Sequence, residues 1–469
     1  MAQTVTLPNP KKYRGLSTFY TIIITQTLSL IGSRVSSLAF GIWIFTETGQ
    51  ATPLALTSFF TALPAVFAGS ISGVLADRWD RRYVMALADT GQAIGTGLLL
   101  LSFASGNFVL WHLYAVALFQ AIFGVFQTPA FNASVTMLIP DDQRVRANAI
   151  RQLTAPSASV IAPLIATFVF ATIGLVGAIL LDLATFFVAV AVILYVHIPM
   201  PEETAVGRAL RGSIWHEMWG GIRYLLDRRP LFYMIGYYAL VNFFLTGATI
   251  FTIPYLLART SNNEAALGIL LAIVNGGAVL GSILIAYLNL KNNRVRYIVI
   301  CAIVTGVMLS LAGMSRTFWA LALTEFFVML PIPIGNALFI SILQAKVPPD
   351  VQGRVFAVMS QVVRLLMPVA FLIAGPLADH ILEPSLTVPQ WGISTPLTGE
   401  LFPVIFHAPG LDLFAPLVGF QSGAGMGLIM VINGLMLVVL ALALNLREDV
   451  RTIETTLEDY RAVSSKPSP

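Results

Sequence analysis

The chain has 469 residues, of which 57% are hydrophobic and only 11% are charged, and its mean hydropathy is +0.81. Soluble domains carry about 25% charged residues, so this composition excludes a soluble globular protein and predicts a polytopic membrane protein. The isoelectric point near 9.2 would suggest nucleic-acid binding in a soluble chain, but here the basic residues flank apolar runs and indicate membrane topology instead.

Cysteine and histidine usage narrows the possible chemistry. The single cysteine, Cys301, lies in an apolar run, and the five histidines show no ligand spacing. These residues exclude a disulfide framework and predict no metal site. The N-terminus is polar as far as Arg14, and the apolar run that follows is too long for the core of a signal peptide, so we expect no cleavage.

Twelve apolar runs are long enough for spanning helices, which need about 20 residues each. Short turns join the first six, and a polar linker with a predicted amphipathic helix at 214–226 separates them from the others. We therefore expect an all-α polytopic membrane protein. The predicted spans are 16–46, 52–76, 83–105, 109–138, 147–172, 174–197, 231–258, 265–290, 295–314, 317–346, 354–380 and 422–446.

The spans group into predicted domains. An N-terminal six-helix bundle and a C-terminal six-helix bundle are expected, with a linker between them and a tail at each end. The predicted boundaries are 1–15 for the N-tail, 16–197 for the first bundle, 198–230 for the linker, 231–446 for the second bundle and 447–469 for the C-tail.

The distribution of basic residues predicts the orientation, because short cytoplasmic loops retain Lys and Arg. With the N-terminus inside, all but four of the 27 basic residues fall in, or within five residues of, the two tails, the linker and the loops after even-numbered spans. Arg34 and Arg364 lie within spans, and only Arg259 and Arg316 face outward. We therefore expect both termini and the linker to be cytoplasmic.

A long outward-facing segment, 381–421, precedes the last span. Its six prolines, among them Pro384, interrupt any helix of spanning length, so we expect short interfacial pieces rather than a thirteenth span. A lid over the transport exit is the alternative.

Two internal sequence repeats support a pair of related halves. The order Pro140-Asp141-Asp142-Gln143-Arg144 after the fourth span recurs, with a gap, around 349–354 after the tenth. Glycines four residues apart occur in the second span of each half, at Gly69 and Gly73 and at Gly277 and Gly281. Such spacing lets helices approach closely, and its recurrence favours a mobile interface between the halves over generic helix packing.

The segment 73–82 places five charges between two apolar runs, so it must lie in water or headgroups as a short hairpin loop. Its order, Gly73-Val74-Leu75-Ala76-Asp77-Arg78-Trp79-Asp80-Arg81-Arg82, resembles the signature loop between the second and third spans of the major facilitator superfamily. The D-R-W-D-R-R form resembles the drug and proton antiporter branch that includes macrolide and siderophore exporters. Asp80 departs from the family pattern, which has a glycine there.

Further segments resemble the same branch in the same order, so that the resemblance covers nearly the whole chain. It implies the major facilitator fold, in which twelve transmembrane helices form two pseudo-symmetric six-helix bundles. Two departures are the missing acidic residue in the loop 289–296 and Ala162-Pro163 where many antiporters have Gly-Pro. The matching segments are 126–131, 146–149, 181–187, 353–356 and 375–379.

The resemblance also implies a gate. In the family, the aspartate of the signature loop caps the cytoplasmic start of the eleventh span, here near 352–356, where free backbone N–H groups attract an anion. We therefore expect Gly73, Asp77, Arg78 and Arg81 to form a gating loop that closes the cytoplasmic side. An ordinary solvated loop is the alternative.

Charged residues within spans cost about 2.5–3.5 kcal/mol each on insertion scales, so each needs an explanation. The resemblance implies that the first, fourth, seventh and tenth spans line the central cavity, which makes Arg34 and Glu325 the first candidates for substrate or proton coupling. They lie at similar predicted depths and can meet across the cavity, where Glu325 would exchange a proton as the conformation changes. A static ion pair is the alternative.

Three other charged residues are weaker candidates for the same role. Asp89 and Asp182 match family positions on scaffold spans, where a structural hydrogen bond to a neighbouring helix competes with proton handling. Arg364 can reach the cytoplasmic half of the cavity and receive an anionic substrate group, or it can pair with a backbone carbonyl or a lipid headgroup.

Together these features predict a secondary active transporter in the cytoplasmic (inner) membrane. It would export amphipathic or hydrophobic small molecules, such as drug, macrolide or siderophore-like compounds, against a proton gradient by rocker-switch alternating access. We expect a lipid-embedded monomer with no cofactor, nucleic acid or ATPase subunit. A transporter of lipid-like molecules is the nearest alternative, and a polytopic membrane enzyme is less favoured because no H-E-x-x-H, G-x-S-x-G or P-loop motif occurs.

Overall fold

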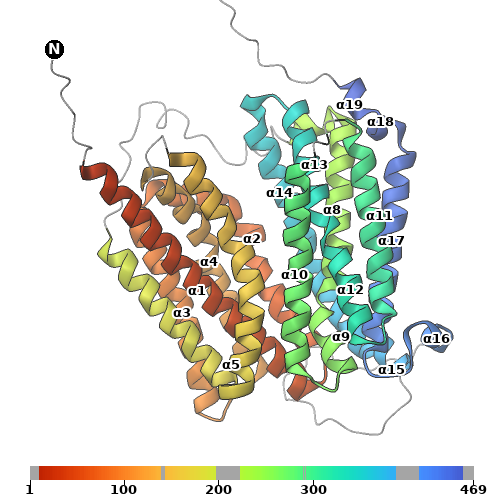
Figure 1. Ribbon diagram of the computed structural model, residues 1–469, viewed down its shortest axis with the longest axis horizontal. Helices are drawn as coiled ribbons and strands as arrows, with labels where there is room; N and C mark the ends of the chain where they lie inside the picture. Colours follow the sequence, from red (N-terminus) through yellow and green to blue (C-terminus); the bar gives the residue numbers. More distant parts are fainter. Residues whose placement is uncertain are drawn as a thin grey trace, which may run out of the picture. The chain divides into compact units, whose positions relative to one another are not determined.

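A computed structural model describes residues 10–138, 143–196, 222–288, 290, 292–386 and 411–457. All regular elements in these ranges are helices (Figure 1). The chain divides into two compact units. The first comprises the described parts of Met1–Trp43 and Phe60–Leu210, and the second comprises Ile44–Phe59 with the described parts of Arg211–Pro396 and Glu400–Pro469.

Ten helical stretches in the described residues are long and apolar enough to cross a membrane. One of them, Thr154–Tyr195, contains two predicted spans, and the apolar helix Thr52–Ala68 supplies a further one. Each of the twelve predicted spans therefore corresponds to a helix, as the all-α prediction requires.

The helices of the first unit follow the predicted runs closely. Asp80, the residue that departs from the family pattern, is the N-cap of α3, and its side chain accepts a hydrogen bond from the backbone N–H of Arg82. Gly174 bends α5 with a φ of 66° and so separates the predicted fifth and sixth spans. The helices are α1 (Pro10–Thr48), α2 (Thr52–Arg78), α3 (Arg81–Ala104), α4 (Leu110–Leu138) and α5 (Arg144–Tyr195).

The second unit contains two interrupted spans. The seventh span breaks after Thr249 into α8 and α9, and the tenth breaks at Leu330, because Pro331 begins a new helix at a position where its missing N–H costs nothing. The spanning helices are α8 (Arg229–Thr249), α9 (Thr252–Arg259), α10 (Glu264–Tyr287), α11 (Arg294–Gly313), α12 (Phe318–Met329), α13 (Pro331–Lys346), α14 (Pro349–Leu377) and α17 (Ala424–Leu446).

The eleventh span is longer than predicted. After α14 the chain continues through the π-helical turn η2 (Ala378–Leu382) into α15 (Glu383–Leu386), so the expected loop start at 381 is wrong. Pro384 does not end the helix because it lies in the first turn of α15, where a proline is tolerated. The rest of the predicted segment to residue 410 lies outside the described residues, and two short helices follow, η3 (Leu411–Phe414) and α16 (Ala415–Val418).

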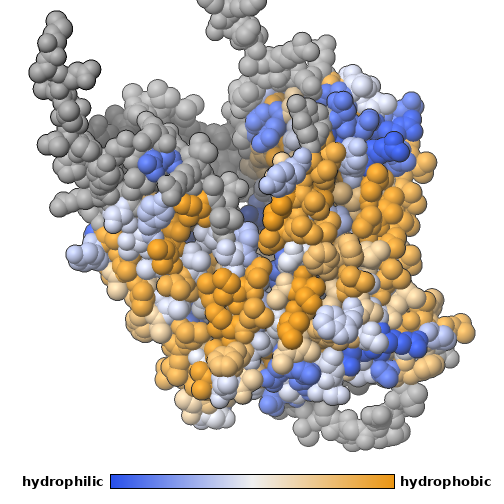
Figure 2. All heavy atoms as spheres, viewed as in Figure 1, coloured by the Kyte–Doolittle hydropathy of each residue, from blue (hydrophilic) through white to orange (hydrophobic). Residues whose placement is uncertain are grey.

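The surface of the second unit fits a membrane environment. Hydrophobic residues cover the middle of its visible face and hydrophilic residues gather at its two ends (Figure 2). Large apolar side chains such as Ile283 on α10, Ile300 on α11 and Val439 on α17 are exposed, which is costly in water but favourable against lipid tails.

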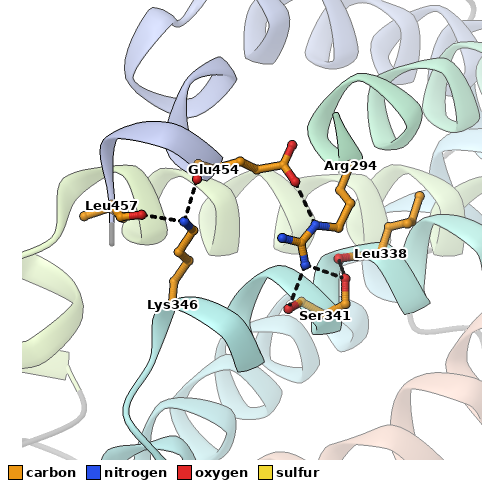
Figure 3. A network of polar contacts seen from close by, with 6 residues as sticks. All are labelled: Arg294, Leu338, Ser341, Lys346, Glu454 and Leu457. Atoms are coloured by element: carbon orange, nitrogen blue, oxygen red, sulfur yellow. Dashed lines mark hydrogen bonds and ion pairs between the residues drawn. The ribbon is translucent and has the colours of Figure 1, made fainter. Parts of the chain in front are cut away.

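The start of the C-tail packs against the second unit. The short helices α18 (Glu448–Arg451) and α19 (Ile453–Thr456) bury Val450 and Ile453 completely in its hydrophobic core. Arg294 pairs with Glu454 at 2.7 Å, and the Lys346 ammonium donates to the Glu454 carbonyl at 2.8 Å (Figure 3). These contacts join α19 to the start of α11 and the end of α13.

One glycine pair has a different role from the predicted one. A Cβ atom on Gly277 would lie 2.4 Å from the Phe326 carbonyl oxygen, and one on Gly281 would lie 2.0 Å from that of Leu330. Both glycines therefore let α10 pack closely against the tenth span inside the second unit. The interpretation of this pair as a mobile interface between halves is wrong. The side chains at 69–78 lie outside the described residues.

Candidate functional site

The predicted gating loop is only partly described. The helix α2 extends to Arg78, but the environments of Gly73, Asp77 and Arg78 lie outside the described residues, and Arg81 is half-buried in the first turn of α3. The role of this loop as a gate stays a prediction.

The five charged residues within spans differ sharply in exposure. Asp89 and Glu325 are 0% exposed and Asp182 is 3% exposed. Arg34 is half-buried, whereas Arg364 is exposed on α14. A buried carboxylate needs a hydrogen-bond donor or a cation. The hydrogen-bond partners of the three acids therefore show how each buried charge is compensated.

Asp182, on the second arm of α5, accepts two hydrogen bonds from hydroxyl groups. Ser33 on α1 donates to one carboxylate oxygen at 3.0 Å, and Thr96 on α3 donates to the other at 3.2 Å. Thr96 in turn accepts from the Gln120 amide at 2.9 Å. Each oxygen of Asp182 therefore has a donor, and these donors come from two other helices.

Asp89, on α3, is surrounded by amides. Gln26 on α1 donates to one oxygen at 2.9 Å, and Gln127 on α4 donates to the other. Gln127 also donates to Gln26 at 3.1 Å and accepts from Gln92 at 3.1 Å. Both carboxylate oxygens of Asp89 are thus satisfied by neutral donors.

These two acids belong to one buried polar cluster, because Gln120 also donates to the backbone carbonyl of Gln92 at 3.0 Å. We call it the first-unit polar cluster. Its donors and acceptors interlock four helical segments without an ion pair to either aspartate among the described residues. Its members are Gln26, Ser33, Asp89, Gln92, Thr96, Gln120, Gln127 and Asp182.

Arg34 follows Ser33 directly but has a different partner. Its guanidinium donates to the Ser159 hydroxyl on the first arm of α5, and Ser159 donates to the Ala155 carbonyl at 2.9 Å. Arg34 and Glu325 lie in different units, so their meeting across the cavity stays a prediction.

Glu325, on α12, has the sparsest environment of the three acids. Thr252 at the start of α9 donates to its Oε1 over 3.4 Å, a long hydrogen bond, and its Oε2 has no hydrogen-bond partner among the described residues. Glu325 lies just over one turn before the break at Leu330, and the next residue, Phe326, offers its carbonyl to the close contact with Gly277. A fully buried acid with an unsatisfied oxygen can accept a proton or a ligand donor.

A pocket inside the second unit was not predicted from the sequence. It has a volume of about 70 Å³ and lies between α8, α11, α13 and α17, with no charged residue among its described lining. The Tyr237 hydroxyl is buried without a hydrogen-bond partner among the described residues. The polar side chains of the pocket are Tyr237, Tyr238, Asn242, Cys301, Thr305 and Asn336.

On one side of the pocket, the rings of Tyr238 and Phe339 stack with their centroids 4.1 Å apart and their planes 7° from parallel. Two asparagines in the seventh and tenth spans, Asn242 and Asn336, were the sequence signal that could have indicated this pocket. Nothing in the linear sequence places Cys301 beside Tyr237.

The chain is similar to known transporters. It is 24% identical over 367 residues to macrolide efflux protein A of Streptococcus pyogenes, an alignment that covers 77% of this chain and 90% of that protein. It is 26% identical over 268 residues to the enterobactin exporter EntS of Escherichia coli, covering 56% and 62% of the two chains.

Among solved structures, a bacterial homologue of the human lysosomal transporter Spinster, in an inward-facing and unoccupied conformation, superposes with a TM-score of 0.67. The two chains are 15% identical, and the match covers 93% of this chain and 96% of that one, which establishes the fold alone. The profile of the Major Facilitator Superfamily matches residues 22–372. The chain therefore belongs to the Major Facilitator Superfamily and is a membrane transporter rather than an enzyme.

Proposed function

We propose that this transporter exports amphipathic or hydrophobic small molecules in exchange for protons, and that Glu325 carries the proton. The observation that supports this assignment is the environment of Glu325, which is fully buried, accepts one long hydrogen bond from Thr252 and has no partner for Oε2 among the described residues. No ion pair to a cation compensates its charge in that part of the chain.

The physical argument concerns what can neutralise a buried carboxylate. Burying an ionised carboxylate without a cation is expensive, and a bound proton removes that cost. Asp89 and Asp182 gain two neutral donors each, whereas Glu325 depends on one. A change of conformation that hydrates Glu325 would release the proton, and a return to the buried state would require a new one. This cycle couples proton binding to alternating access.

The pocket supports a neutral substrate group. About 70 Å³ is half of the roughly 150 Å³ apolar cavity that accepts benzene, so the pocket holds one small side group rather than a whole drug molecule. Its lining offers the Tyr237 hydroxyl and two asparagine amides but no charge. We infer that it receives an uncharged, hydrogen-bonding group of an otherwise apolar substrate. The two curated relatives are named as a macrolide efflux protein and an enterobactin exporter, so both names describe the export of small molecules.

Transport into inside-out vesicles tests the proposal. The probe is radiolabelled erythromycin, and a pH gradient with an acidic interior is imposed without ATP. We expect accumulation that disappears when nigericin collapses the gradient and that is absent in vesicles carrying the Glu325→Gln protein. Accumulation that is independent of the gradient would contradict proton coupling, and movement of a fluorescent phospholipid instead of erythromycin would favour the lipid-like alternative.

The proposed orientation places both termini in the cytoplasm. Alkaline phosphatase, which is active only outside the cytoplasm, would be fused after Gly106 in the turn between α3 and α4 and after Arg447 at the end of α17. We expect activity from the Gly106 fusion and none from the Arg447 fusion. The reverse result would invert the orientation.

A further inference from the structure

The eleventh span contacts the start of α2 near its own end. Asp379, in η2, accepts hydrogen bonds from the backbone N–H of Ala51 at 3.1 Å and from that of Thr52 at 2.5 Å. N–H groups at a helix start have no partner within the helix and carry partial positive charge. The carboxylate of Asp379 therefore caps α2 from another helix, at the end of the protein that the basic-residue distribution predicts to face outward.

Gly375 makes this contact possible. A Cβ atom at this position would lie 2.7 Å from the Ala55 Cβ and 2.9 Å from the Thr52 Cα. Only a glycine lets the backbone of α14 approach the first turn of α2 this closely. Gly375 and Asp379 thus act together, one by close approach and the other by charge.

The same residues recur at the far end of the partner helix. The order Gly375-Pro376-Leu377-Ala378-Asp379 at the end of the eleventh span repeats, with one difference, at 73–77, where α2 ends. The second copy contains Asp77, the residue that the family resemblance predicts to cap the start of α14. The same Gly-x-Leu-Ala-Asp order thus lies at the end of α2 and across the junction of α14 with η2.

We propose that Gly375 and Asp379 form the outer latch of the transport cycle. The structure shows the outer latch closed. Residues 44–59 are grouped with the second unit, although α1 and α2 continue into the first. The outer ends of these two helices therefore stay with the second unit until the contact of Asp379 with α2 breaks. Alternating access then requires the outer latch to open as the gate predicted at Asp77 closes. This inference rests on the transporter fold and does not depend on proton coupling.

A neighbouring acid supplies a matched control. Glu383, one turn after Asp379, accepts hydrogen bonds from the backbone N–H of Gly423 at 2.5 Å and of Gly425 at 2.7 Å. It therefore caps the start of α17, and α14 and α17 both belong to the predicted C-terminal bundle, whereas α2 belongs to the predicted N-terminal bundle. The chemistry matches that of Asp379, but this contact lies within one helical bundle and has no reason to break during transport.

Double electron–electron resonance can measure the opening of the outer latch. Cys301 is the only cysteine in the sequence, so Cys301→Ser gives a clean background for spin labels at Asn107→Cys and Ala265→Cys, two exposed positions near predicted outer turns. We expect Asp379→Asn to move the distance distribution towards longer, outward-open values, with about a tenfold change in the open-to-closed ratio. Asp77→Asn should shift it the opposite way, and Glu383→Gln should leave it unchanged.

Gly375→Ala is the second variant, because it weakens the same latch by displacing α2 without removing a charge. It should shift the distribution in the same direction as Asp379→Asn. An unchanged distribution in both outer variants would overturn the proposal. A shift of the Asp77 and Asp379 variants in the same direction would also overturn it, because general destabilisation would then explain both. Erythromycin transport need not be measurable for either result, so this test is independent of the proposed substrate.

Discussion

The acids buried in the first unit and the acid buried in the second have opposite surroundings. Asp89 and Asp182 each accept hydrogen bonds at both carboxylate oxygens, from residues on two neighbouring helices. Glu325 is as deeply buried but accepts only one long hydrogen bond. Burial alone therefore does not identify a coupling residue. The number of satisfied oxygens separates an acid that joins helices from an acid that is available for a proton.

The largest expected effect comes from removing the titration of Glu325. Glu325→Gln keeps the volume of the side chain and an oxygen acceptor for Thr252, but it cannot bind and release a proton. We expect loss of substrate-induced proton release and of gradient-driven export, while exchange of labelled for unlabelled erythromycin continues. Fluorescent pH measurements on proteoliposomes, together with the exchange assay, check this. Retained proton release would place the coupling site elsewhere.

The second prediction disturbs the helix that carries Glu325 without changing the acid. Gly277→Ala would force a Cβ to within 2.4 Å of the Phe326 carbonyl oxygen, so α10 and α12 must move apart, at a cost of about 1–3 kcal/mol for overpacking. We expect a lower thermal unfolding temperature and reduced export. The matched control is Gly276→Ala, where an added Cβ meets no atom within 4 Å. Equal effects of the two changes would show that the close contact does not matter.

The third prediction tests the other side of the comparison. Asp182→Asn replaces one acceptor oxygen with an NH₂ group, so Ser33 or Thr96 loses its carboxylate acceptor. Among the described residues, only Ser33 of the two has a second acceptor, the Ser29 carbonyl at 3.1 Å. Leaving such a buried donor unsatisfied costs about 1–3 kcal/mol. We expect a lower unfolding temperature in detergent but intact proton coupling. If coupling fails in Asp182→Asn and survives in Glu325→Gln, the coupling site lies on the sixth span and the assignment of Glu325 is wrong.

The smallest expected effect concerns the single donor to Glu325. Thr252→Val keeps the shape of the side chain and removes a hydroxyl whose contact with Glu325 is 3.4 Å long. A neutral hydrogen bond contributes about 0.5–1.5 kcal/mol, and one this long belongs at the low end, so export should fall less than about threefold. A loss as large as that of Glu325→Gln would mean that Thr252 takes part in proton transfer itself.

Sequence patterns predicted much of the fold because hydrophobic length is a local property. A run of about 20 apolar residues must span the membrane whatever its neighbours are. Gly174 could be placed at a turn because it lies between two such runs. The helix ends were less certain. The eleventh span continues to Leu386 because Pro384 lies in the first turn of α15 and not in a helix interior. The sequence alone does not show which of these positions a proline occupies.

The partners of the buried residues were decided only by the tertiary structure. Asp89, Asp182 and Glu325 look alike in the sequence, as single acids in apolar runs. What distinguishes them is the side chains brought beside them from other helices, such as Ser33 and Thr96 for Asp182, which are 149 and 86 residues away. In the same way, the spacing of Gly277 and Gly281 predicted a close helix contact but did not identify the partner helix. Hydrophobicity acts along the chain and determines which segments enter the membrane, whereas hydrogen bonds and close packing act across it and determine what each buried group can do.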